Sequence, residues 1–277
     1  MNPVLSKEIY QRFRGYIGVM ILFLYLAFIG LFTLASIYVL WLDNKHTFIL
    51  GENFAAFAIL AIFQFIVLCF VIPGLTSGTV SGERERQTFD VLLITKLSTF
   101  QIIFGKVISS LAFIMLLLIA TLPMYGLVLL LGGINLKQIL LLFGFYFITS
   151  ILFASIGIAC SVSVNRVIVG TVCAYILTAL VSLGSFVVGI FINILRDISI
   201  SMDGTVNIEH STYIYELLYS YLMSINPISV LVAILGESTD MLTLPYLLPY
   251  WVTYTLFCAV ISVSLLMYSI WRINPLK

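Results

Sequence analysis

Long apolar runs alternate with short polar segments along this chain of 277 residues. A helix needs about 20 apolar residues to cross the hydrocarbon core of a bilayer, and six runs reach that length. We predict membrane-spanning helices over residues 16–41, 54–76, 101–131, 137–163, 167–195 and 247–271. These runs are continuous and do not alternate with a period of two, so helices are favoured over the strands of a membrane barrel.

The composition agrees with this pattern, since 62% of the residues are hydrophobic and only 9% are charged. A soluble globule has no need of so apolar a composition. The first run is too long for a signal peptide and lacks a small-residue cleavage site, so it is expected to remain as a helix. The predicted fold is an all-α membrane protein with a single transmembrane domain over residues 1–277.

The basic residues predict the orientation, because Lys and Arg collect on the cytoplasmic side of a membrane. With the N-terminus inside, ten of them fall on that side, and three fall outside, namely Lys45, Lys137 and Arg196. Both termini are therefore expected in the cytoplasm. The net charge of only +1 gives no reason to expect binding to nucleic acid.

The segment before the first span is expected to form an amphipathic helix along the lipid headgroups. Leu5, Ile9 and Phe13 share one helical face, and the charged residues fall elsewhere. The charged residues are Lys7, Glu8, Arg12 and Arg14. The alternative is a charged stop that only orients the first span.

The longest external segment, residues 196–246, is expected to carry two short helices that dip into the outer leaflet. Residues 211–223 place apolar side chains on one face, with tyrosines such as Tyr213 and Tyr221, whose rings favour the membrane interface. Asn226 and Pro227 then open a run that is too short to span the bilayer. Gly236 is expected to end that run.

Chemistry within the chain is sparse. The predicted span interiors hold no carboxylate or histidine, and Lys106, one turn into its span, is expected to reach the cytoplasmic surface. No phosphate-binding loop or zinc-hydrolase motif is present, and the four cysteines lack paired ligand spacing. We therefore expect no catalytic residue, no metal and no cofactor bound by this chain.

The hairpin between the second and third spans, residues 77–100, is the exception. It places Glu83, Arg84, Glu85 and Arg86 side by side in a chain that is otherwise almost free of charge. Ser81 is expected to cap a helix that begins at Gly82 or Glu83 and projects its first turn into the cytoplasm.

From Phe89 onward, apolar residues share a face that can rest on the membrane domain. Ser98 and Gln101 match a capping box that starts the third span. The alternative is a solvated loop whose charges only anchor the two spans.

The hairpin also carries a resemblance to a known family. The sequence SGERERQTFDVLLITKLS, followed by Gly105 and Lys106, resembles the first cytoplasmic loop of permease subunits in type-2 ABC exporters. The N-terminal sequence NPVLSKEIYQRFRG and the run that opens at Asn226 and Pro227 are also similar to that family. With six spans and a long loop before the sixth, the resemblance covers essentially the whole chain.

The resemblance implies that the hairpin is a coupling helix seated in a groove of a separate ATP-binding subunit. The positions concerned are Glu83, Arg84, Glu85, Arg86, Gln87, Thr88 and Phe89. It further implies a connecting helix at Lys7–Arg14 and an external lid that includes Tyr213, Tyr221, Asn226 and Pro227. Two ATPase subunits, which bind ATP and Mg, would rock a pair of permeases in the cytoplasmic (inner) membrane.

A non-transporting membrane scaffold or sensor, or an intramembrane enzyme, is the alternative function. Few polar groups lie in the spans, chiefly Gln64 and Asn193, so an amphipathic cargo such as a lipid, peptide or drug is favoured over a small ion.

Glu85→Arg or Arg86→Glu is expected to uncouple ATP hydrolysis from transport.

Pairing with a second permease, identical or not, is also open. Small residues on one face of the fourth span could form either kind of helix interface. They are Gly144, Ser150, Ala154, Gly157 and Ser161.

Overall fold

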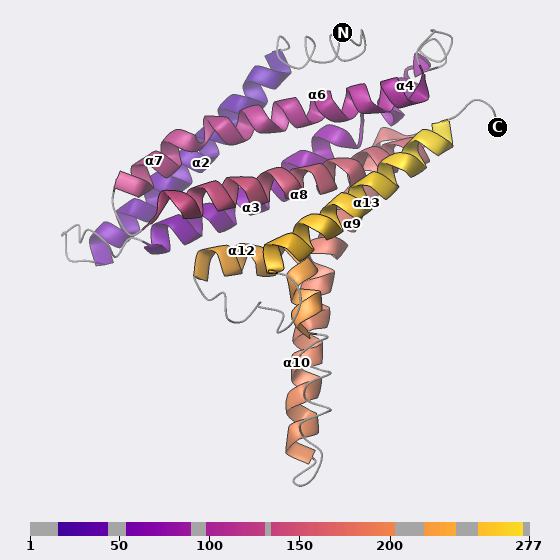
Figure 1. Cartoon of the computed structure of the whole chain (residues 1–277). Helices are drawn as coiled ribbons and strands as arrows, with labels where there is room; N and C mark the ends of the chain where they lie inside the picture. The colour runs from indigo at the N-terminus through magenta and orange to yellow at the C-terminus, as the bar shows by residue number, and fades with distance from the viewer. Residues whose placement is uncertain are drawn as a thin grey trace. The chain divides into compact units, whose positions relative to one another are not determined.

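The computed structural model describes residues 16–43, 54–89, 98–130, 134–202, 219–236 and 249–273, and every regular element within them is helical. Figure 1 shows these elements. They are α2 (Tyr16–Asp43), α3 (Phe54–Thr76), α4 (Ser81–Glu85), α6 (Thr99–Ala120), α7 (Leu122–Leu130), α8 (Leu136–Ser163), α9 (Val167–Ala179), the π-helical turn η1 (Leu180–Gly184), α10 (Ser185–Met202), α12 (Pro227–Gly236) and α13 (Tyr250–Ile273).

Six helices in the described part of the chain are long and apolar enough to cross a membrane, as predicted. Each begins within three residues of its predicted start. The end of the fifth differs, because α10 continues to Met202 although the apolar run stops at residue 195. A helix satisfies its own backbone groups, so it can extend past the apolar run that places it in the membrane.

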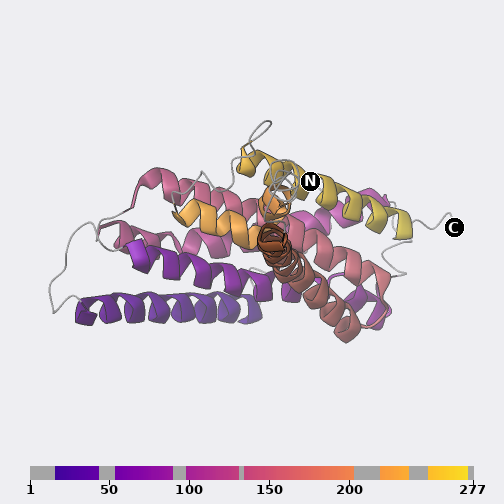
Figure 2. The ribbon, with the colours of Figure 1, turned by 90° about the horizontal axis from the view of Figure 1, so that it is seen from below.

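The chain divides into two compact units, one made of residues 1–175 and 262–277 and the other of residues 176–261. In the first unit α3 packs against α2 and α8, and α6 also packs on α8. Figure 2 shows α2 and α3 running alongside one another. The Tyr146 hydroxyl of α8 donates to the Ala61 carbonyl of α3 over 2.7 Å, so this contact is polar as well as apolar.

The third span is interrupted just before Pro123. Helix α6 ends at Ala120 and α7 begins at Leu122, with Thr121 between them. The Thr121 hydroxyl donates to the Leu118 carbonyl over 2.7 Å and accepts from the Gln64 amide over 3.2 Å. Gln64 is fully buried, so it ties α3 to this break and does not line an open path in this structure.

The small-residue face of α8 is used inside the chain. Ser150, Ala154, Gly157 and Ser161 are all buried, and a Cβ placed on Gly157 would clash with the Thr76 side chain at the end of α3. The interpretation of these four residues as an interface to a second permease is therefore wrong. Small side chains let two helix backbones approach closely, and here the partner is α3 of the same chain.

Candidate functional site

The charged hairpin begins as a continuation of α3. Ser77 N donates to the Pro73 carbonyl and Gly82 N to the Gly78 carbonyl, so the chain keeps an almost helical path from α3 into α4. The residue before α4 is Val80, and the Ser81 hydroxyl donates to the Ser77 carbonyl over 2.9 Å. The predicted N-cap at Ser81 is wrong, because the first amides of α4 already have partners.

Helix α4 is shorter than predicted, since it ends at Glu85 and does not continue to Phe89. Gln87 adopts a φ of 55°, in the left-handed region. The Thr88 amide and hydroxyl both donate to the Glu83 carbonyl, over 3.0 and 3.2 Å, which closes the end of the helix. A left-handed residue just past a helix is a common way to reverse the chain.

The start of the third span follows the prediction. The Ser98 hydroxyl accepts from the Gln101 amide over 3.3 Å, and the Gln101 side chain accepts from the Ser98 amide over 3.2 Å. Both halves of the capping box are therefore present.

The turn into α4 rests on α8 and α9. The Ser161 hydroxyl accepts from the amides of Val80 and Ser81 over 2.9 and 3.0 Å. The hydroxyls of Ser77 and Thr171 lie 2.9 Å apart. The Ser161 hydroxyl thus satisfies two backbone amides in an apolar bundle, where an unpaired amide would be costly. The hairpin is therefore fixed at its base by hydrogen bonds from two spans.

Glu83 and Lys106 form an ion pair between α4 and α6. The Lys106 Nζ lies 2.8 Å from Glu83 Oε1 and donates to the Thr79 carbonyl over 2.9 Å. The Lys106 side chain is 1% exposed, so the expectation that it reaches the cytoplasmic surface is wrong. A buried ammonium group needs a counter-charge and hydrogen-bond acceptors. The Glu83 carboxylate and the Thr79 carbonyl supply them.

Arg84 links α4 to the end of α8. Its Nη1 donates to the Val162 carbonyl over 2.7 Å and to Asn165 Oδ1 over 3.3 Å. The guanidinium carbon lies 5.1 Å from the centre of the Phe89 ring, a cation–π distance. Cations and helix C-terminal carbonyls attract one another, so this contact suits the charge of Arg84.

Glu85 links α4 to the start of α9. Its Oε1 accepts a hydrogen bond of 2.8 Å from the amide of Val167, the first residue of that helix. Carboxylates favour helix N-termini, where amides are free and the dipole is positive. Glu85→Arg would therefore disturb the hairpin itself, so it cannot test a partner contact cleanly.

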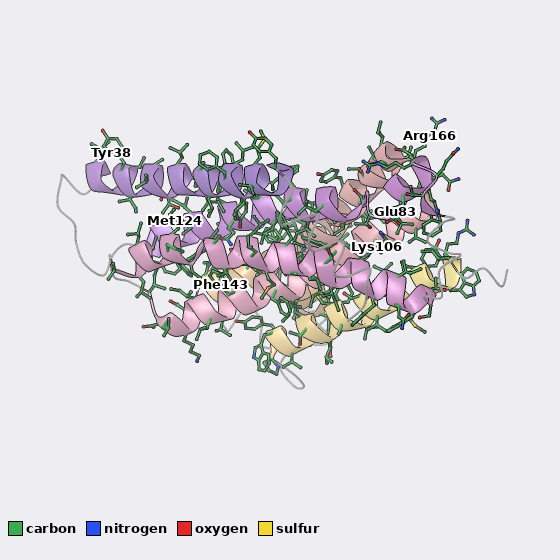
Figure 3. All side chains as sticks on the ribbon, turned by 90° about the horizontal axis from the view of Figure 1, so that it is seen from above. Tyr38, Glu83, Lys106, Met124, Phe143 and Arg166 are labelled. Atoms are coloured by element: carbon green, nitrogen blue, oxygen red, sulfur yellow. The ribbon has the colours of Figure 1, made fainter. Side chains whose placement is uncertain are left out.

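Three of the four adjacent charges thus serve contacts within the chain. Glu83 and Arg84 are partly buried, and the prediction that they project into the cytoplasm is wrong. Arg86, Gln87 and Thr88 are exposed. Figure 3 shows Glu83, Lys106 and Arg166 toward one end of the bundle, with Tyr38 toward the other.

An apolar cluster underlies the hairpin and joins it to several spans. Phe89 is buried in it, as predicted, and Ile273 brings in the end of α13, so the last span ends beside the hairpin. This agrees with the predicted topology, in which both lie on one side of the membrane. The buried members are Val80, Phe89, Ile103, Val107, Ile158, Val162 and Ile273.

Sequence reasoning missed the partners of the hairpin, which are Lys106, Ser161, Asn165 and Val167. The isolated cation inside an apolar run was the available signal for Lys106, since such residues usually have a specific partner. Asn165 lies in the short turn between α8 and α9, and Val167 begins α9, but no local pattern there indicates contact with α4.

The structure describes part of the region where two short outer helices were predicted. In the second unit, a helix over Tyr219–Ile225 meets α12 at 92°, and α12 begins at Pro227 and ends at Gly236 as predicted. Tyr221 is exposed and Pro227 is buried. Tyr213 lies outside the described residues, as do Lys7, Glu8, Arg12 and Arg14 of the expected N-terminal helix.

Asn226 holds this bend together. Its Oδ1 accepts from the amides of Ile228 and Ser229 over 2.7 and 3.3 Å, which caps α12. Its Nδ2 donates to the Ser182 carbonyl over 3.1 Å and to Ser185 Oγ over 2.8 Å. The π-helical turn η1 thus meets α12 through one buried amide.

No protein-family model matches the chain, and no curated protein matches it. Among the described residues, no group of three or more His, Cys, Asp or Glu side chains could hold a metal ion. The hairpin and its contacts are the best-defined candidate site among the described residues.

Proposed function

We propose that this chain is the membrane subunit of an ATP-driven exporter, and that the hairpin is where a separate ATP-hydrolysing subunit acts on it. The observation that carries the proposal is the triple connection of α4. Glu83 bonds to α6, Arg84 to the end of α8 and Glu85 to the start of α9. A force on the tip therefore reaches three spans at once.

The nature of these contacts supports a transmitting role. Charge-assisted hydrogen bonds are shorter and stronger than neutral ones, and here they measure 2.7 to 2.8 Å. A loop that only anchored two spans would need its charges in water, and it would need no link to α9. The described contacts favour the coupling interpretation over the solvated loop.

In this proposal ATP and Mg belong to the partner subunit, and two such subunits drive a pair of membrane chains. Conformational changes of this kind need packed elements with discrete arrangements, and α4 joins the spans that would move. The cargo is proposed to be amphipathic, because the spans offer mainly apolar surface. The short helices that meet at Asn226 are proposed to form the external lid.

The test is to purify the tagged chain from its native membranes in nanodiscs, with any companion subunits attached. We expect ATP hydrolysis in the same fraction. Trapping with ATP and vanadate is then expected to change deuterium uptake in α4 and in the turn at residues 163–167. Recovery of the intact chain without any nucleotide-hydrolysing companion would contradict the proposal and favour the scaffold or sensor alternative.

A further inference from the structure

Polar side chains from several helices meet inside the first unit, next to the break in the third span. Gln64 of α3 donates through its amide group to the Thr121 hydroxyl at the break over 3.2 Å. Tyr25 of α2 lies beside Gln64. Tyr125 of α7, one turn after Thr121, lies beside Tyr146 of α8. Together these residues are defined as the break cluster.

The break cluster contains polar atoms that are buried without a hydrogen-bond partner among the described residues. They are the hydroxyls of Tyr25 and Tyr125 and the side-chain oxygen Oε1 of Gln64. Tyr25 is 4% exposed, Tyr125 1% and Gln64 0%, so bulk water does not reach them. Buried polar groups in folded proteins are bonded to other protein groups or to ordered water, because leaving them unpaired is costly.

The neighbouring hydroxyls cannot supply the missing partner of Gln64 Oε1, because their hydrogens are already used. The Thr121 hydroxyl donates to the Leu118 carbonyl over 2.7 Å, and the Tyr146 hydroxyl donates to the Ala61 carbonyl over 2.7 Å. A hydroxyl group has a single hydrogen to donate. The donor that Gln64 Oε1 lacks must therefore come from outside these two side chains.

The rings around Tyr125 are apolar and offer no partner either. Phe57 and Phe143 meet the Tyr125 ring edge-on, with centroids 6.1 and 5.3 Å away. Such contacts satisfy the ring but not the hydroxyl. A small molecule that both donates and accepts hydrogen bonds would satisfy the cluster.

From this arrangement we infer that the break cluster is a binding site for buried water, held by Gln64 Oε1 and by the hydroxyls of Tyr25 and Tyr125. A buried water molecule typically makes about three hydrogen bonds to otherwise unpaired polar groups, and these atoms offer both acceptors and donors. Every member of the cluster is a neutral group, whereas a cation in an apolar bundle would need a counter-charge.

Water at this position also accounts for a tolerated break in a spanning helix. Ordered water is one of the means by which membrane proteins satisfy polar groups around such breaks. The inference does not depend on the proposed function, since it concerns the packing of α2, α3, α7 and α8 alone.

Radiolytic labelling of the wild-type protein is the direct test. The protein is exposed to an X-ray pulse in nanodiscs, in water enriched in heavy oxygen. Hydroxyl radicals form from water next to a side chain, so a buried ring is oxidised only where water lies against it. We expect heavy oxygen on Tyr25 and Tyr125. Phe153 is the control, because it is fully buried about two turns further along α8 from Tyr146, and it should stay unlabelled.

Phenylalanine substitutions test whether the hydroxyls hold the water. Tyr125→Phe should reduce labelling of Tyr25 about fivefold, which is the change in occupancy expected from one lost hydrogen bond of ordinary strength. Tyr25→Phe and Tyr125→Phe should each lower the melting temperature by roughly 2–4 °C. Tyr16→Phe is the matched control, since Tyr16 is 83% exposed, and it should leave the melting temperature unchanged.

A dry cluster gives the opposite signs. Removal of a hydroxyl that is buried and unpaired relieves a penalty, so the Tyr25 and Tyr125 variants would then melt at a higher temperature than the wild type. Unlabelled Tyr25 and Tyr125 in the wild type overturn the inference whatever the variants do. Equal labelling of Phe153 also overturns it, because water would then enter the bundle without a specific site.

Discussion

Lys106 is the residue on which the hairpin most depends. A lysine with 1% of its side chain exposed inside an apolar bundle is tolerated only with a counter-charge, which Glu83 provides at 2.8 Å. The pair is asymmetric, because the Glu83 side chain keeps 26% of its surface exposed. The exposed part is not the free carboxylate oxygen, because Glu83 Oε2 is buried and has no hydrogen-bond partner among the described residues.

Glu83→Gln is expected to lower the free energy of unfolding by about 2–3 kcal/mol, because it leaves a buried cation without its counter-charge. Lys106→Met should also be destabilising, since it removes the counter-charge of a carboxylate whose Oε2 is already buried without a partner among the described residues. The double variant should be more stable than the sum of the two losses predicts, by at least about 1 kcal/mol. Denaturation in mixed micelles measures all three, and strict additivity would show that the two residues are not coupled.

At the scale of elements, the base of the hairpin packs against α8. The small residues of α8 let the end of α3 approach closely. The two glycines of α8 that face different surroundings make this testable. A Cβ at Gly157 would clash with Thr76, whereas a Cβ at Gly144 would have no neighbour within 4 Å.

Gly157→Ala is expected to destabilise the protein by about 1–3 kcal/mol, as overpacking does in a close contact. Gly144→Ala is the matched control, and it should be neutral or stabilising by up to about 1 kcal/mol through helix propensity. The measurement is the free energy of unfolding in detergent. Equal effects of the two substitutions would contradict the close α3–α8 contact.

The outer bend of the second unit depends on Asn226, which is fully buried. Asn226→Ala should cost about 1–3 kcal/mol, because the Ser182 carbonyl and the first amides of α12 lose a partner. Asn226→Ser keeps a capping oxygen but loses the amide donor, so it should be intermediate. Deuterium exchange at the amides of Ile228 and Ser229 reports the cap, and unchanged exchange in the alanine variant would contradict it.

At the scale of the whole molecule, the six spans could be predicted from the sequence because each is a continuous apolar run of sufficient length. The capping box at Ser98 and Gln101 and the short helix from Pro227 to Gly236 could be predicted because their signals are local. The contacts that the charged side chains of the hairpin make within the chain could not be predicted. Their partners lie at Lys106, Val162 and Val167, and no local pattern links such distant positions.

The central claim is that mechanical work enters the chain at the tip of the hairpin, from a separate nucleotide-hydrolysing subunit. Gln87 is the position to examine, because it is exposed and lies at the point where α4 ends. Replacing it with a photo-crosslinking residue places a reporter at the tip. Lys137, exposed at the start of α8, offers the control position.

Illumination of native membranes, after labelling with radioactive azido-ATP, is the most direct measurement. The account predicts a crosslinked product from position 87 that carries the nucleotide label, and none from position 137. Crosslinks from position 87 to lipid alone, or labelling of position 87 from the outside of the cell, would contradict it.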